Sequence, residues 1–185
     1  MNAEPGGGSL YTGTMKVLGL AGSLRRASCN RGLLRAAAEV LDVETLDLGD
    51  LPLYNADDEV DPPAPVRQLR KRVRASDAIL FATPEYNYSV PGVLKNAIDW
   101  GSQPKGHNVW DGKPAAIIGA ANSSVGTARA QLHLRQSLVA LNMRVFNTEL
   151  LVGGAMARFD AEGNLTDPET RAALREFLAR WIPRD

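Results

Sequence analysis

The fold is decided by residues 16–30, which read KVLGLAGSLRRASCN. The first six of these residues form an apolar run without polar alternation, which is typical of a strand covered on both faces of a parallel sheet. A long loop of small and polar residues follows, and the next apolar stripe predicts a helix with Asn30 as its cap. The segment therefore predicts the first strand–loop–helix unit of an α/β fold.

The same unit recurs along the chain. Further strands are expected at 78–82 and 115–120, with an edge strand at 43–48 and a weaker strand near 144–151. Helical stripes separate them, and the clearest one follows Asp167 as N-cap and Pro168 in the first turn. Five alternations of strand and helix predict a doubly wound, five-stranded parallel sheet in the order 2-1-3-4-5, with helices on both faces.

Composition narrows the classes of function. The 185 residues suit a single domain, which we place at 15–185 after a flexible Gly-rich leader at 1–14. Because 21 Lys and Arg balance 21 Asp and Glu, the charge does not favour binding to nucleic acid. One cysteine and two histidines predict neither a disulfide nor a metal site. No apolar run reaches the roughly 20 residues of a membrane helix. We therefore expect a cytoplasmic protein.

The helix expected at Thr127–Leu141 carries two apolar stripes. Leu134, Leu138 and Leu141 lie on one face, and Ala128, Leu132 and Val139 lie roughly 140° away at about 100° per residue. A helix on the outside of a sheet needs one such stripe. The second predicts a homo-oligomer, either a dimer or a tetramer, that forms through this helix, and the alternative is that a loop of the same chain covers it.

Three loops should meet where ligands bind in such sheets, beyond the carboxyl ends of the strands at the point where strand order reverses. Residues 22–30 offer hydroxyl, amide and guanidinium groups at a helix N-terminus, which favours a phosphate, although a capped polar turn is the simpler alternative. Residues 84–92 contain Pro84 and Pro91, which stiffen the loop, and this loop could support a flat ring. Residues 121–127 form a third loop of small and polar residues. Neither a dinucleotide-binding glycine motif nor a P-loop is present.

Motifs in these loops resemble the NADPH-dependent FMN reductase family. This flavodoxin-like group includes bacterial chromate and quinone reductases and is related to azoreductases. The matching motifs are Gly22-Ser23-x-Arg25-x-x-Ser28-x-Asn30, Pro84-Glu85-Tyr86-Asn87 with Pro91-Gly92, and Lys95-Asn96-Ala97-Ile98-Asp99-Trp100. The resemblance extends from Met15 onward, and it implies a flavodoxin-like fold, non-covalently bound FMN, and NADPH or NADH as electron donor.

The resemblance also implies roles for individual residues. The 5′-phosphate would be held by Ser23, Arg25, Ser28 and Asn30, with the backbone of Cys29 nearby. The isoalloxazine ring would lie against Pro84, Glu85, Tyr86 and Asn87, with main-chain groups addressing its polar edge. The third loop would contribute Ala121 and Asn122, but it departs from the family pattern at Ala121, Ser123 and Thr127. Subunits would pair through the fourth helix, and Tyr54 and Asn55 would approach the neighbour's flavin.

The expected function is therefore an FMN-dependent NAD(P)H oxidoreductase without a catalytic side chain, since the cofactor carries the redox chemistry. Electrons would pass in ping-pong order to quinones, chromate, azo compounds or free flavin. A non-catalytic electron carrier of the flavodoxin type is the alternative, but such carriers use an acidic surface and this chain is neutral. Cys29 and Arg35 have the spacing of small tyrosine phosphatases, yet Leu33 and Leu34 between them belong to a helix stripe.

Overall fold

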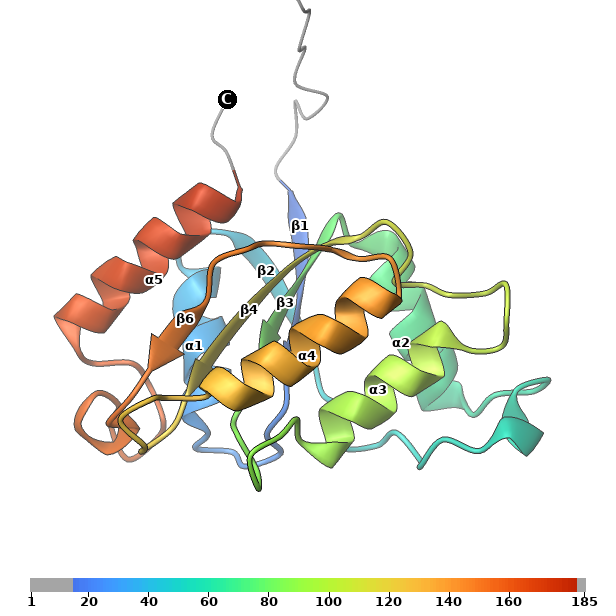
Figure 1. The fold of residues 1–185 in the computed structure, drawn as a ribbon, viewed down its shortest axis with the longest axis horizontal. Coiled ribbons are helices and arrows are strands. Elements are labelled where there is room, and N and C mark those ends of the chain that lie inside the picture. The colour runs from blue at the N-terminus through green and yellow to red at the C-terminus, as the bar shows by residue number, and fades with distance from the viewer. Residues whose placement is uncertain (1–14, 183–185) are drawn as a thin grey trace, which may run out of the picture.

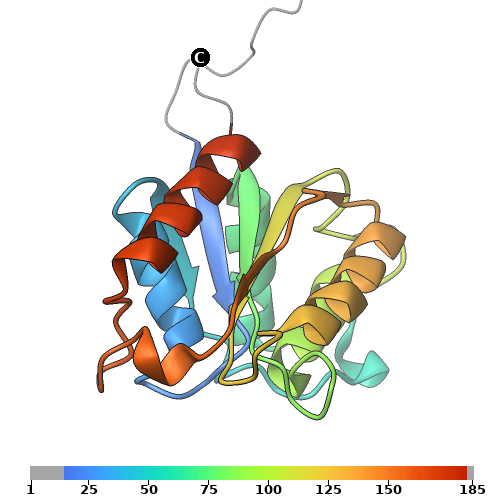
Figure 2. The same cartoon turned by 60° about the vertical axis from the view of Figure 1, so that its left-hand side comes forward.

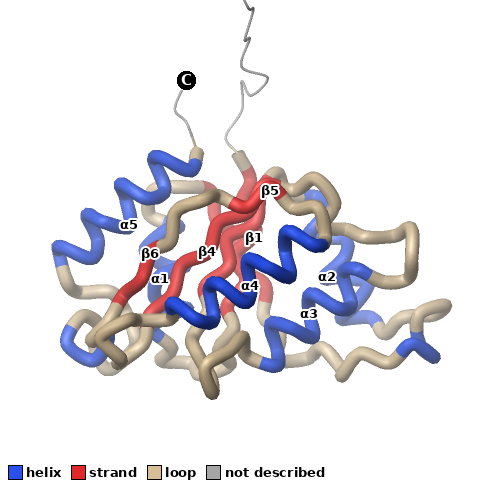
Figure 3. Tube along the Cα trace, viewed as in Figure 1, coloured by secondary structure: helices blue, strands red, loops and turns tan. Residues whose placement is uncertain are grey.

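The computed structural model describes residues 15–182, in which one parallel sheet lies between two layers of helices (Figure 1). Its strands are β1 (Lys16–Ala21), β2 (Asp42–Leu46), β3 (Ala78–Ala82), β4 (Pro114–Ala120), β5 (Arg144–Val145) and β6 (Leu150–Val152). They pair in the order β2-β1-β3-β4, and β4 then pairs with β5 and, further along, with β6. The predicted order is confirmed, and the fifth strand is divided into β5 and β6 because the ladder is interrupted after Phe146, whose N–H donates to the Ala115 carbonyl at 2.7 Å (Figure 3).

Helices cover both faces of this sheet (Figure 2). On one face lie α1 (Cys29–Ala38) and α5 (Pro168–Trp181), and on the other lie α2 (Ala64–Ala75), α3 (Gly92–Ser102) and α4 (Ala128–Ala140). Strand side chains alternate between the two cores: Val17 packs with α1 and α5, whereas Leu18 and Leu20 pack with the other three helices. Burial on both faces explains why β1 is apolar without alternation.

The helix caps agree only partly with the sequence analysis. Asp167 caps α5 as predicted, and its carboxylate accepts a hydrogen bond from the Thr170 N–H at 2.9 Å. The prediction of Asn30 as the cap of α1 is wrong. The cap is Ser28, which has an extended backbone and accepts from the Arg31 N–H, so Asn30 lies inside the first turn. Its side chain is thus free to bond elsewhere in the fold.

A close approach at Gly32 holds α1 against the segment that follows β6. A Cβ atom at this position would lie 1.9 Å from the Gly163 carbonyl oxygen and 3.3 Å from the Phe159 ring. The segment after β6 therefore forms a wall beside the N-terminal end of α1. The predicted leader at 1–14 lies outside the described residues. Within residues 15–182, no helix combines the length and apolar character needed to cross a bilayer.

Candidate functional site

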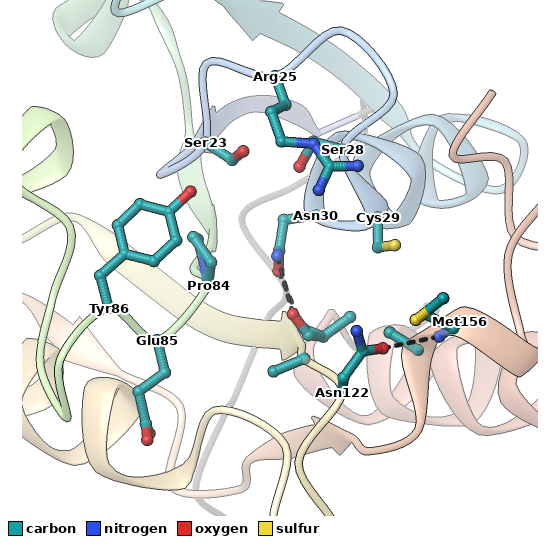
Figure 4. A pocket seen from close by; sticks show the side chains of 13 residues that line it. Ser23, Arg25, Ser28, Cys29, Asn30, Pro84, Glu85, Tyr86, Asn122 and Met156 are labelled. Carbon is teal, nitrogen blue, oxygen red and sulfur yellow. Dashed lines mark hydrogen bonds between the residues drawn. The ribbon is translucent and has the colours of Figure 1, made fainter. Parts of the chain in front are cut away.

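A cavity of about 270 Å³ lies at the carboxyl ends of β1, β3 and β4 (Figure 4). The strand order reverses here, because β2 and β3 lie on opposite sides of β1. Four loops line the cavity through Ser23, Arg25, Ser28, Cys29, Asn30, Pro84, Glu85, Tyr86, Ala120, Ala121, Asn122, Ala155 and Met156. The structure thus brings together every residue proposed to contact the cofactor within one subunit, except Asn87.

The loop between β1 and α1 forms the polar end of this cavity. Ser23 and Ser28 are buried, and Arg25 is exposed with one guanidinium N–H donated to the Ala27 carbonyl at 3.1 Å. The first backbone N–H groups of α1 have no partner within the helix, and its first turn contains no acidic residue. These donors, the helix dipole and Arg25 together favour an anion. Arg31 stabilises the loop by donating to the Ser23 carbonyl at 2.9 Å.

Asn30 connects this loop to β4. Its amide nitrogen donates to the Ala120 carbonyl at 3.0 Å, and its amide oxygen accepts from the Ala120 N–H at 2.9 Å. Two residues earlier in β4, the Ile118 carbonyl accepts a hydrogen bond from the Thr83 N–H, so it faces the β3 side of the strand. Because the direction of the backbone groups alternates along a strand, the N–H and carbonyl of Ala120 face the same side. The chain turns away from the sheet at Pro84, and the Asn30 carboxamide takes the place of the missing strand. The structure therefore gives Asn30 a structural role beside its predicted phosphate contact.

The loop after β3 forms a tight hairpin beside the cavity. Tyr86 and Ser89 exchange two backbone hydrogen bonds, and the residues between them, Asn87 and Tyr88, have positive φ angles of 48° and 67°. Positive φ at both central positions is typical of a type I′ turn, which asparagine tolerates well. Asn87 therefore lies at the exposed tip and does not line the cavity. The Tyr86 ring reaches over the cavity toward Ser23 (Figure 4).

The Glu85 carboxylate points away from the cavity (Figure 4). It accepts from the side-chain Nε of Arg129 at 2.6 Å and from the backbone N–H groups of Arg129 and Ala130 at 3.0 and 3.2 Å. Burial raises the pKa of the Glu85 carboxyl, but these hydrogen bonds and the Arg129 charge outweigh it and hold the pKa below its ordinary value. Glu85 thus caps α4 from a different loop, since Thr127 makes no side-chain cap.

Two further contacts connect the hairpin with α4. The Arg129 guanidinium lies over the Tyr88 ring, 3.7 Å from its centroid. The Ser89 hydroxyl lies 3.0 Å from Nδ1 of His133. The loop that borders the cavity is therefore attached to the helix for which subunit pairing is predicted.

The fourth wall of the cavity was not predicted from the sequence. Ala155 and Met156 follow β6, and the Met156 N–H donates to the Asn122 side-chain oxygen at 2.9 Å. Because β6 lies next to β4, the loop after it opens on the same edge as the loop that contains Asn122. The fifth predicted strand and the glycines at 153 and 154 were the signals that could have identified this wall.

Tyr54 and Asn55 do not line the cavity. The Tyr54 N–H donates to the Asn96 side chain at 2.8 Å, its hydroxyl bonds Glu59, and its ring packs edge-on against Trp100. Asn55 caps the short helix at Ala56–Asp58. These contacts hold the loop after β2 in a defined conformation, and its predicted approach to a neighbouring subunit stays a prediction.

The cavity suits a bound cofactor better than catalysis by side chains. Its titratable residues are Arg25, Cys29, Glu85 and Tyr86, and the Glu85 carboxylate is turned away. No histidine lines it, and residues 15–182 contain no group of acidic, cysteine and histidine side chains placed to hold a metal ion. Anion donors at one end and an aromatic, proline-bounded loop at the other match a ligand with a phosphate and a flat ring.

Comparison with known proteins gives one consistent result. The family model for NADPH-dependent FMN reductases matches residues 15–157. The chain is 46% identical to an NAD(P)H-dependent FMN reductase of Pseudomonas aeruginosa over 92% of this chain and 96% of the relative. It is 41% identical to a 2-hydroxy-1,4-benzoquinone reductase of Burkholderia, over 91% and 96% of the two chains. The structure of the flavoenzyme NAD(P)H:(acceptor) oxidoreductase FerB from Paracoccus denitrificans is similar, with a TM-score of 0.81, 38% identity and coverage of 90% and 94%.

Proposed function

Because this chain belongs to the NADPH-dependent FMN reductase family and is an NAD(P)H-dependent oxidoreductase that uses FMN, we propose that the cavity at the carboxyl end of the sheet is its FMN site. The observation that carries the proposal is that one cavity combines the polar loop at the start of α1 with the hairpin after β3. The donors present fit a flavin mononucleotide, which has an anionic phosphate at one end and a flat ring system at the other.

The polar end would hold the 5′-phosphate. The Ser23 and Ser28 hydroxyls, the Arg25 guanidinium and the backbone N–H of Cys29 are the donors there. Asn30 lies in the same wall, where its bonds to Ala120 orient the loop. With no acidic residue in the first turn of α1, the helix dipole adds to the attraction for the phosphate.

The other end would hold the ring. Pro84 is buried and stiffens the backbone there, and Tyr86 borders the cavity with a half-exposed ring. Ala121 and Asn122 border the opposite side. When bound, FMN supplies hydride acceptance and electron release, so the protein needs to orient it and leave one face open. Donor and acceptor would then use the same open face in turn, which gives ping-pong kinetics.

Quinones are the proposed electron acceptors. Relatives that match most of this chain bear the names 2-hydroxy-1,4-benzoquinone reductase and quinone reductase. Chromate, azo compounds and free flavin are further candidates, because an open flavin face does not select strongly among oxidants. A cytoplasmic location stays a prediction from the sequence.

The exposed face of α4 supports subunit pairing. Leu134 and Leu138 are fully buried against the sheet, whereas Leu132 and Val139 are each 58% exposed, so no described segment of the same chain covers the second stripe. We propose that a second copy covers it, with Tyr54 and Asn55 of one subunit near the flavin of the other. Leu132→Glu with Val139→Glu should convert the oligomer to a monomer in analytical ultracentrifugation, while Val40→Glu, at an exposed site after α1, should not.

The test of the cofactor site and of the reaction starts with the absorbance spectrum of the purified protein. Flavin bands should be present or appear on adding FMN, and Arg25→Ala should weaken FMN binding. NADPH and NADH should then reduce the bound flavin, and a quinone should restore it. Parallel double-reciprocal plots would support ping-pong order. Absence of flavin binding would refute the proposed site, and flavin binding without steady NAD(P)H oxidation would favour the electron-carrier alternative.

A further inference from the structure

A second hollow of about 250 Å³ adjoins the cavity at its polar end. Both hollows are lined by Arg25, Cys29, Ala155 and Met156, and the second is completed by Ala27, Phe159, Asp160 and Ala161. Because these lining residues are shared, the second hollow continues the cavity proposed for FMN. Together they form one groove, and Arg25 lies where the two parts meet.

Arg25 is suited to a phosphate at this junction. Its guanidinium donates to the Ala27 carbonyl at 3.1 Å, and a guanidinium has four further N–H donors. The side chain is exposed and can therefore face either hollow. A ligand with two linked phosphates could thus place one in the FMN site and the other at Arg25.

Beyond Arg25 the chemistry of the groove changes. The Asp160 carboxylate accepts from the Asn164 backbone N–H at 2.7 Å and from its side-chain amide at 3.0 Å. The backbone hydrogen bond from Asn164 is the main reason why the pKa of Asp160 lies below its ordinary value, so the carboxylate is ionised at neutral pH. An ionised carboxylate repels phosphate and accepts hydrogen bonds, which suits ribose hydroxyls or the exocyclic amine of adenine.

The same hollow offers an apolar surface for a planar base. Met156 is 82% exposed at its rim, and Phe159 lies beneath with only 7% of its surface exposed. A flexible thioether can adapt to the face of an aromatic ring. Arg25 and Met156 line both hollows, whereas Phe159 and Asp160 line only the second. A phosphate at Arg25 would therefore place an attached ribose and base between the exposed thioether and the carboxylate.

We propose that the hollow lined by Ala27, Phe159, Asp160 and Ala161 is an adenylate subsite, with the phosphate at Arg25 and the nucleoside between Met156 and Asp160. The inference rests on the proposed FMN site, since it places the subsite beyond the phosphate end of that cavity. Two molecules could supply the adenylate: FAD bound in place of FMN, or the NAD(P)H that reduces the flavin.

The test uses a matched pair of variants. Ala161 is exposed and lines only the second hollow, so Ala161→Trp should fill it without touching the FMN cavity. Ala157 is exposed on the same segment and lines neither hollow, so Ala157→Trp is the control. The first probe is 5′-AMP, titrated into the protein by calorimetry. Ala161→Trp should weaken AMP binding about tenfold or more, a change of about 1.4 kcal/mol.

Two further arms identify the source of the adenylate. Where FAD supplies it, Ala161→Trp should weaken FAD binding to the apoprotein about tenfold and change FMN binding less than about twofold. Where NAD(P)H supplies it, the variant should raise the KM of FMN-loaded protein for NADPH or NADH, but not for reduced nicotinamide mononucleotide, which lacks the adenylate.

The proposal is overturned if AMP fails to bind the wild-type protein, or if Ala161→Trp affects the adenylate-containing ligands no more than Ala157→Trp does. Failure of FMN to bind the wild-type protein would refute the cofactor site instead, and the AMP titration separates these two failures because it needs no flavin.

Discussion

Removal of the Asn30 side chain should destabilise the protein even without a cofactor. Asn30 is 3% exposed, and its carboxamide is the partner of both the N–H and the carbonyl of Ala120, which is 4% exposed. Asn30→Ala would leave both backbone groups buried without this partner. A buried polar group that loses its hydrogen bond costs about 1–3 kcal/mol, so the free energy of unfolding should fall by roughly 2–4 kcal/mol after partial relaxation.

Urea denaturation of the apoprotein, followed by circular dichroism, measures this loss. For a chain of this size, a fall of about 2–4 kcal/mol in the free energy of unfolding corresponds to a fall of roughly 4–16 °C in Tm. Asn30→Asp should cost a similar amount near neutral pH, since it keeps the acceptor for the Ala120 N–H but sets a carboxylate oxygen against the Ala120 carbonyl. Asn147→Ala is the control, because Asn147 is exposed between β5 and β6.

A role in phosphate binding alone gives a different outcome. In that case Asn30→Ala would weaken FMN binding but leave the stability of the apoprotein within about 0.5 kcal/mol of the wild type, as expected for an unimportant surface site. Such a result would refute the structural role that the contacts with Ala120 assign to Asn30.

Three more predictions concern contacts around the site. Gly32→Ala should lower stability by about 1–3 kcal/mol in urea denaturation, because its Cβ would meet the Gly163 carbonyl, whereas Gly92→Ala, with open space around it, should not. Glu85→Ala should speed amide exchange at Arg129 and Ala130 without affecting α5, and unchanged exchange would show that Glu85 does not cap α4. Hydrogen bonds from Thr170 lower the pKa of the Asp167 carboxyl in the folded protein. The ionised carboxylate therefore stabilises the fold at pH values above the ordinary pKa of 3.8, and this stabilisation is lost as the pH falls through the lower pKa of the folded state. Asp167→Asn should therefore lower Tm by less as the pH falls from about 6 to below 3.8, and an effect on Tm that does not change with pH would contradict this.

Much of the architecture could be predicted because it depends on local patterns. The continuous apolar runs of β1, β3 and β4 indicate strands buried on both faces, and Asp167-Pro168 indicates the start of α5. The edge at which the loops meet follows from strand order, so residues in the loops after β1, β3 and β4 could be assigned to one cavity.

Side-chain direction could not be predicted in the same way. The motif places Glu85 beside the ring through main-chain groups, but it does not show that the Glu85 carboxylate bonds the start of α4, 44 residues away. Asn30 bonds Ala120 across 90 residues, where β3 has left the sheet. Met156 was missed because the divided fifth strand is a weak pattern. In each case the deciding neighbour is distant in the sequence.

The attachment of the hairpin after β3 to α4 has a thermodynamic consequence. Glu85 and Ser89 join the loop beside the proposed flavin ring to the helix proposed to pair subunits. If pairing stabilises one arrangement of α4, it also stabilises one arrangement of that loop, and such coupling is reciprocal. Dissociation to the monomer would then weaken cofactor binding by some factor, and removal of the cofactor would weaken subunit association by the same factor. Flavin occupancy would in this way depend on protein concentration.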